Sequence, residues 1–97
     1  MNSLPKEQLA KALLSLKNEK EMESFLVDLL TPAEMEEFVA RLTIAKQLSE
    51  GQTQRNIAQN LKSGVATVTR VNQWLNRGAG GYKLVLERLY NHRHQRH

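Results

Sequence analysis

The chain has 97 residues and a net charge of +4, with 14 Lys/Arg against 10 Asp/Glu and no cysteine. This length predicts one domain with a modest core, and the lack of cysteine excludes disulfides and thiolate metal sites. The sequence does not open like a signal peptide, and no run approaches the roughly 20 apolar residues that span a bilayer. We therefore predict a single helical domain over residues 1–97, cytoplasmic and without a membrane partner.

The charge is divided unequally between the two halves. Residues 1–50 carry six Lys/Arg and nine acidic residues, a net of −3, whereas residues 51–97 carry eight Lys/Arg and only Glu87, a net of +7. A basic half favours a polyanionic partner such as nucleic acid. The alternative is a solubilising surface that is basic without such a role.

Residues 1–50 contain the start signals of three helices. Pro5 suits a first helical turn, and Asn18 with Glu21 forms a capping pair for a second helix. Thr31 and Glu34, with a proline directly after the threonine, predict a capping box for a third helix. That third helix is expected to bury these apolar residues: Met35, Phe38, Val39, Leu42, Ala45 and Leu48.

Residues 53–75 predict a helix-turn-helix. Thr53 can cap a first helix that ends near Leu61, and Gly64 suits the turn because glycine tolerates left-handed backbone angles. The apolar residues recur at spacings of three and four, which gives each helix one inward face: Ile57, Ala58, Leu61, Val65, Val68 and Val71. The second helix of this motif usually enters the DNA major groove.

The outer face of the second motif helix has side chains that suit DNA. Threonine and alanine contact thymine methyl groups, while asparagine, glutamine and arginine bond base edges or phosphates. The outer set comprises Ala66, Thr67, Thr69, Arg70, Asn72 and Gln73. Gln54 and Arg55 open the preceding helix, whose N–H groups can also meet a phosphate. The alternative is an ordinary helix pair with a polar face.

The end of the chain adds a last helix and a polar tail. The glycines between residues 78 and 81 predict a flexible connection, and the last helix has its apolar stripe at Tyr82, Val85, Leu86 and Leu89. The tail, residues 91–97, is polar and basic, and its three histidines, His92, His94 and His97, are interpreted as solvated rather than metal-binding. No catalytic constellation is recognisable, so we predict neither an enzyme nor a metal site.

Several motifs together resemble the Trp repressor superfamily: Leu30-Thr-Pro-Ala-Glu34, Arg41, Gly51-Gln-Thr-Gln-Arg55 and Gly64-Val-Ala-Thr-Val-Thr-Arg70. The run from Arg70 to Gly78, followed by Tyr82 and Leu89, resembles the Trp-repressor-like YerC/YecD branch more closely still. The resemblance implies an all-α, six-helix helix-turn-helix fold and an intertwined homodimer on a near-palindromic DNA operator. The half-site spacing of about 34 Å is that of helix-turn-helix dimers, Trp repressor among them.

The resemblance also implies which residues contact DNA. The matching positions are Gln54, Arg55, Gly64, Val65, Ala66 and Thr69. A further contact of the family, a lysine in the first motif helix, corresponds to Ala58 here. That single contact is therefore not expected in this chain.

The family's L-tryptophan pocket is altered in this sequence. The positions that match the pocket are Thr31, Arg41, Thr67, Arg70, Val71 and Trp74. In the family, the two arginines sandwich the indole. Val71 stands where the family has a glycine, and Trp74 stands where it has a serine. Because an overfilled pocket excludes its ligand, these two side chains disfavour L-tryptophan as a cofactor. Taken alone, Trp74 is interpreted as core or interface packing.

We therefore predict a DNA-binding transcriptional regulator, a repressor, that acts as a homodimer without L-tryptophan. Three alternatives stay open. The first is a repressor of the same type that depends on L-tryptophan. The second is a helical interaction module without DNA binding, and the third is a non-specific, nucleoid-type DNA binder.

Overall fold

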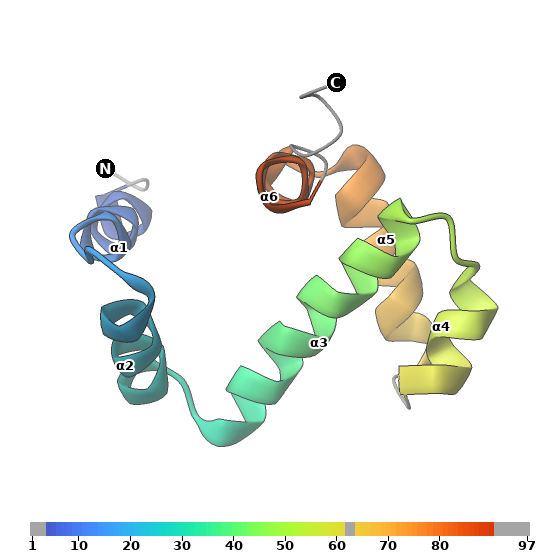
Figure 1. Ribbon diagram of the computed structural model, residues 1–97, viewed down its shortest axis with the longest axis horizontal. Coiled ribbons are helices and arrows are strands. Elements are labelled where there is room, and N and C mark those ends of the chain that lie inside the picture. Colours follow the sequence, from blue (N-terminus) through green and yellow to red (C-terminus); the bar gives the residue numbers. More distant parts are fainter. Residues whose placement is uncertain (1–3, 62–63, 91–97) are drawn as a thin grey trace. The chain divides into compact units, whose positions relative to one another are not determined.

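The computed structural model describes residues 4–61 and 64–90, and these form six helices (Figure 1). The helices are α1 (Leu4–Leu14), α2 (Glu19–Leu29), α3 (Pro32–Ser49), α4 (Gln54–Leu61), α5 (Val65–Arg77) and α6 (Gly81–Leu89). The all-α, six-helix prediction is confirmed, and the second motif helix continues two residues beyond the expected Leu75. None of the described helices has the length and apolar character that crossing a membrane requires.

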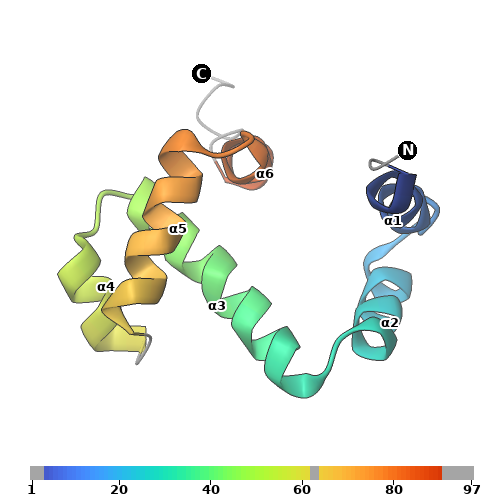
Figure 2. The same cartoon turned by 180° about the vertical axis from the view of Figure 1, so that it is seen from behind.

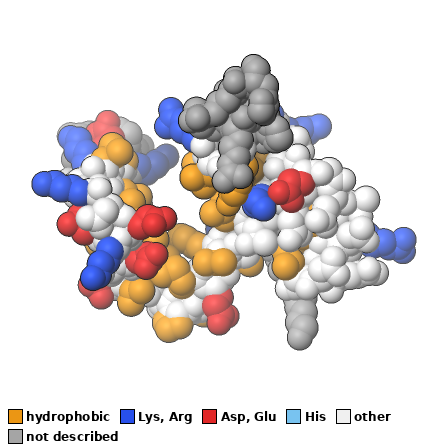
Figure 3. Space-filling view, viewed as in Figure 1, with side chains coloured by type: hydrophobic (Ala, Val, Ile, Leu, Met, Phe, Trp, Pro, Cys, Tyr) orange, Lys and Arg blue, Asp and Glu red, His pale blue; other side chains and the backbone are white. Residues whose placement is uncertain are grey.

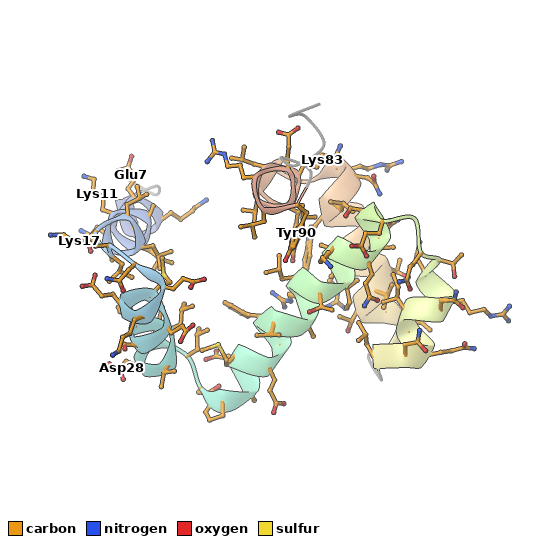
Figure 4. The ribbon with its side chains drawn as sticks, viewed as in Figure 1. Glu7, Lys11, Lys17, Asp28, Lys83 and Tyr90 are labelled. Carbon is orange, nitrogen blue, oxygen red and sulfur yellow. The ribbon has the colours of Figure 1, made fainter. Side chains whose placement is uncertain are left out.

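The chain divides into two compact units, one ending at Glu36 and the other beginning at Glu37. The first unit holds α1, α2 and the first turn of α3. On α1, Glu7 and Lys11 lie four residues apart on the same side of the helix (Figure 4). The second unit holds the rest of α3 together with α4, α5 and α6, and it contains the predicted motif.

Local side-chain caps start two of the helices as the sequence predicts. The Asn18 side chain accepts a hydrogen bond of 2.9 Å from the Glu21 N–H, and the Glu21 carboxylate accepts one from the Lys17 N–H. At α3, the Thr31 hydroxyl accepts from the Glu34 N–H at 3.1 Å, and the Glu34 carboxylate accepts from the Thr31 N–H at 2.9 Å. These bonds satisfy N–H groups that have no partner within the helix, so the helix starts are fixed locally.

The core of the second unit lies where four helices meet. α5 contacts both α4 and α6, and α3 supplies the remaining side of the core (Figures 1 and 2). Its buried residues are Ile44, Ala45, Ile57, Val68, Val71, Leu75 and Leu86. Burying an aliphatic side chain of this size contributes about 1.5–3 kcal/mol, so this cluster is the main apolar contribution to the unit.

The predicted buried face of α3 was wrong in part. Ala45 is buried as expected, but the second fully buried position is Ile44, which the prediction omitted. Phe38 and Val39 are 47% and 58% exposed, and Leu42 is also exposed. Hydrophobic side chains are accordingly visible over α3 in the space-filling view (Figure 3). The helix carries apolar residues on more than one side, and only one of these sides faces the core of its own chain.

Glycines form defined caps at the turns. Gly51 follows α3 with φ 96°, and Gly80 precedes α6 with φ 93°, backbone angles that glycine adopts without the steric cost of a β-carbon. Gly78 ends α5, where its N–H donates to the Trp74 carbonyl at 2.9 Å. Gly78 is thus the C-cap of α5 and Gly80 the N-cap of α6, and the flexibility predicted for residues 78–81 stays a prediction.

Replacing Gly78 with alanine should destabilise the fold. A β-carbon there would lie 2.4 Å from the Trp74 carbonyl oxygen, which is backbone and cannot move aside easily. Overpacking of this kind costs about 1–3 kcal/mol, and each kcal/mol lowers the melting temperature of such a domain by about 4–8 °C. Thermal unfolding followed by circular dichroism measures the change. Gly81→Ala is the matched control, because a β-carbon there meets nothing within 4 Å; equal melting temperatures for the two variants would contradict the prediction.

Candidate nucleic-acid interface

The start of α4 presents two of the predicted DNA-binding side chains. Thr53 caps this helix as expected, since its hydroxyl accepts from the Asn56 N–H at 3.1 Å and its carbonyl accepts from the Ile57 N–H. Gln54 and Arg55 follow in the first turn; Gln54 is half-buried and Arg55 is exposed. Burial of Ile57 in the core holds this turn against α5.

The predicted outer face of α5 is exposed along the helix. Val68, Val71 and Leu75 point into the core, and the opposite positions recur at spacings of three and four. The exposed set comprises Ala66, Thr69, Arg70 and Gln73, while Thr67 is half-buried. Asn72 is half-buried too, and its side-chain oxygen accepts from the Asn76 amide at 3.1 Å. A row of polar and basic side chains therefore lies on the side of α5 away from the core.

Val65 does not face the core as the periodicity predicted, because it is 65% exposed. Val65 is the first residue of α5, so no preceding turn of the helix packs beside it. Val65 lines an open hollow together with Arg55, Ala58, Gln59 and Gly64. Its exposure agrees with the DNA-contact role that the family resemblance implies rather than with the core role that its spacing suggested.

Gly64 does not need the left-handed backbone that the sequence suggested. Its φ is −65° and its ψ is 150°, and the two residues before it, 62 and 63, lie outside the described part of the chain. A β-carbon at Gly64 would meet nothing within 4 Å. Gly64 is the N-cap of α5, a position that favours glycine over alanine, and the open space beside it leaves room for close approach of another molecule.

Replacing Gly64 with alanine should leave the fold unchanged and weaken DNA binding. The backbone angles suit alanine and the site is open, but alanine is a poorer helix N-cap than glycine, so the melting temperature should fall by no more than about 8 °C. A methyl group placed between the start of α5 and DNA should raise the dissociation constant at least threefold, since close packing tolerates added volume poorly. Fluorescence anisotropy with operator DNA measures the affinity. Unchanged affinity would mean that DNA does not approach Gly64.

Arg41 and Trp74, two of the predicted pocket residues, contact each other. The Arg41 guanidinium carbon lies 5.3 Å from the centre of the Trp74 ring and 5.7 Å from that of Phe38. Its Nη2 atom also donates to the Glu37 carboxylate at 2.8 Å. A guanidinium within about 6 Å of an aromatic ring face is attracted to it by about 0.5–2 kcal/mol. The chain's own indole thus lies against Arg41, and Phe38 completes a cluster that sequence reasoning did not assemble.

The other predicted pocket positions lie on α5 and at the start of α3. Val71 is fully buried in the core, and the Thr67 N–H donates to the Gly64 carbonyl at 3.0 Å. Arg70 lies four residues before Trp74, so the two occupy the same side of α5. Thr31 belongs to the first unit, where its hydroxyl caps α3. Its part in a pocket stays a prediction.

Tyr82 is a further group near Arg41 that the sequence did not single out for this region. It is half-buried against the core, and burial raises the pKa of its phenol above the usual value. The positive charge of Arg41 lowers this pKa in part. The phenol is therefore neutral at physiological pH, and Arg41 acts among aromatic groups rather than as an isolated surface charge.

Across residues 4–61 and 64–90, no group of three His, Asp or Glu side chains is placed to hold a metal ion. The three histidines of the tail, His92, His94 and His97, lie outside these residues.

Comparison with known families shows which protein family the chain belongs to. Residues 6–90 match the family described as Trp repressor protein. The chain belongs to the Trp repressor family. Family membership makes it a DNA-binding transcriptional regulator and not an enzyme, which favours this interpretation over an interaction module without DNA binding.

Solved structures of Trp repressor-like proteins share the fold. A TrpR-like protein from Eubacterium eligens is 42% identical, with 86% of each chain covered and a TM-score of 0.79. A protein described as a "putative Trp repressor" from Staphylococcus aureus is 32% identical, with 89% of this chain and 86% of that chain covered and a TM-score of 0.81. A search of curated proteins gave no significant match.

Proposed function

We propose that the chain is a transcriptional repressor that reads a near-palindromic operator as a homodimer and does not require L-tryptophan. The observation that supports DNA reading is the exposed row on α5, next to Arg55 at the start of α4. Base edges in the major groove are read by side chains of these types on a helix. The described Lys/Arg residues of α4, α5 and α6 are opposed by one acidic residue, Glu87, which favours attraction to phosphate.

Dimerisation is supported by the apolar side chains that the second unit leaves exposed. On α3 these include Phe38 and Val39, and on α6 they include Leu84, Val85 and Leu89. Such a density of exposed apolar groups is unusual for a monomer of this size and is typical of an interface. The family resemblance implies a second copy as the partner. Light scattering should give twice the chain mass of 11.1 kDa; the mass of one chain at micromolar concentration would contradict the homodimer.

Independence from L-tryptophan is supported by the contact between Trp74 and Arg41. An indole already lies 5.3 Å from the guanidinium that the family resemblance assigns to ligand binding. Val71, where the family has glycine, is fully buried and adds volume to the same region of α5. A free tryptophan would have to displace one side chain and compress another. Together with the run from Arg70 to Gly78, this departure is the reason to propose the YerC/YecD branch.

Selection of bound DNA from a random pool, with and without L-tryptophan, tests the proposal. We expect one enriched, near-palindromic sequence that is the same under both conditions. Isothermal titration of the protein with L-tryptophan should give no binding heat at micromolar concentration. Binding heat, together with enrichment only in the presence of tryptophan, would indicate the ligand-dependent repressor instead. Binding without any enriched sequence would indicate a nucleoid-type protein.

A further inference from the structure

The two motif helices are joined by a side-chain hydrogen bond that lies on the exposed side of the motif. The Thr69 hydroxyl of α5 donates to the Gln54 Oε1 atom of α4 at 3.0 Å. The two residues are 15 positions apart in sequence, so the bond depends on the packing of α4 against α5. Both side chains also belong to the set that the sequence assigned to DNA contact.

This bond determines which end of the Gln54 amide points outward. The carboxamide is planar, with Oε1 and Nε2 on opposite arms, so an oxygen held by Thr69 directs the nitrogen away from Thr69. Nε2 is a donor only. Oε1 already accepts a hydrogen bond from Thr69, whereas the two N–H groups of Nε2 point away from that bond. The arrangement therefore favours an acceptor on DNA as the partner of Gln54.

We propose that Thr69 is a positioning residue that acts through Gln54 rather than by its own contact with DNA. Its hydroxyl fixes the amide so that Gln54 Nε2 donates to an acceptor oxygen or nitrogen of DNA. That acceptor is either on a base edge, such as guanine O6 or N7 or thymine O4, or on a phosphate. This inference rests on the proposed DNA-binding function and deepens it.

A double-mutant cycle on operator DNA tests the inference. Thr69→Val keeps the branched shape and removes the hydroxyl, and it should raise the dissociation constant about threefold to tenfold, the range of one neutral hydrogen bond. Thr69→Ser keeps the hydroxyl and should bind within about twofold of the parent. In a Gln54→Ala background, Thr69→Val should change affinity less than about twofold. An equal loss in both backgrounds would overturn the proposal, because Thr69 would then contact DNA itself.

Selection of bound DNA from a random pool, done with the parent and with Thr69→Val, distinguishes a base acceptor from a phosphate acceptor. If the acceptor is a base, Thr69→Val should relax preference at one position of each half-site and leave the others unchanged. If it is a phosphate, affinity should fall uniformly across sequences without a change in preference. Thermal unfolding serves as the control, since Thr69 is exposed and Thr69→Val should melt within about 3 °C of the parent.

A measurement without DNA separates failure of this inference from failure of the proposed function. The NMR order parameter of the Gln54 side-chain nitrogen should be high in the parent and in Thr69→Ser, and clearly lower in Thr69→Val. Equal order in the parent and Thr69→Val would overturn the positioning role even if DNA binds. Absence of DNA binding by the parent would instead contradict the proposed function, while the order parameters still decide whether Thr69 positions Gln54.

Discussion

Replacing Ile57 with alanine should lower the free energy of unfolding by about 2–5 kcal/mol. Ile57 is fully buried where α4 meets α3 and α5, and its truncation removes apolar contacts and leaves a cavity. A protein of this size has only about 5–15 kcal/mol of stability in total, so the loss is a large part of it. Urea denaturation followed by circular dichroism measures the change from the shift in midpoint.

Val65→Ala is the matched control for Ile57→Ala. Val65 lies in the same motif and has a β-branched apolar side chain, but it is largely exposed. Its replacement should change the free energy of unfolding by less than about 0.5 kcal/mol. Comparable destabilisation by the two variants would mean that Val65 is buried in solution, by a second copy or another partner.

Arg55→Ala should raise the dissociation constant for operator DNA by roughly 10–100-fold. Arg55 is exposed in the first turn of α4 and lines the hollow beside Gly64 and Val65. A base contact by arginine contributes about 1–3 kcal/mol, and each 1.4 kcal/mol corresponds to about a tenfold change in the dissociation constant. Fluorescence anisotropy at several salt concentrations measures the affinity. If Arg55 binds phosphate, the salt dependence should also become shallower by about one ion per contact.

Lys83→Ala is the control for Arg55→Ala, because it removes the same charge from another helix. Lys83 lies on α6 (Figure 4), whereas Arg55 lies on α4, and α5 contacts both of these helices. We expect a change in affinity below about threefold, from the smaller net charge alone. If both variants lose affinity equally, binding depends on overall charge and the reading surface is not at α4.

The parts of the fold that follow from short-range signals could be predicted from the sequence. The caps at Asn18, Thr31 and Thr53 join residues no more than four positions apart, so both partners are visible in one short window. The apolar periodicity of residues 57–75 also predicted Ile57, Val68 and Val71 as core. Neither signal requires knowledge of what packs against the helix.

The misses arise where the partner of a side chain is distant in the sequence. α3 carries apolar residues on several sides, and nothing local indicates that Ile44 rather than Phe38 faces the core. The hydrogen bond between Thr69 and Gln54 and the contact between Trp74 and Arg41 likewise depend on how helices pack.

The contact of Trp74 with Arg41 has a consequence for how such a regulator responds in the cell. If the indole that completes the site is covalently part of the chain, L-tryptophan cannot be withdrawn from that site to switch the protein off. Occupancy of the operator then follows the amount of protein present. The speed of a response is set by synthesis, dilution and degradation of the chain, which is slower than the release of a small molecule.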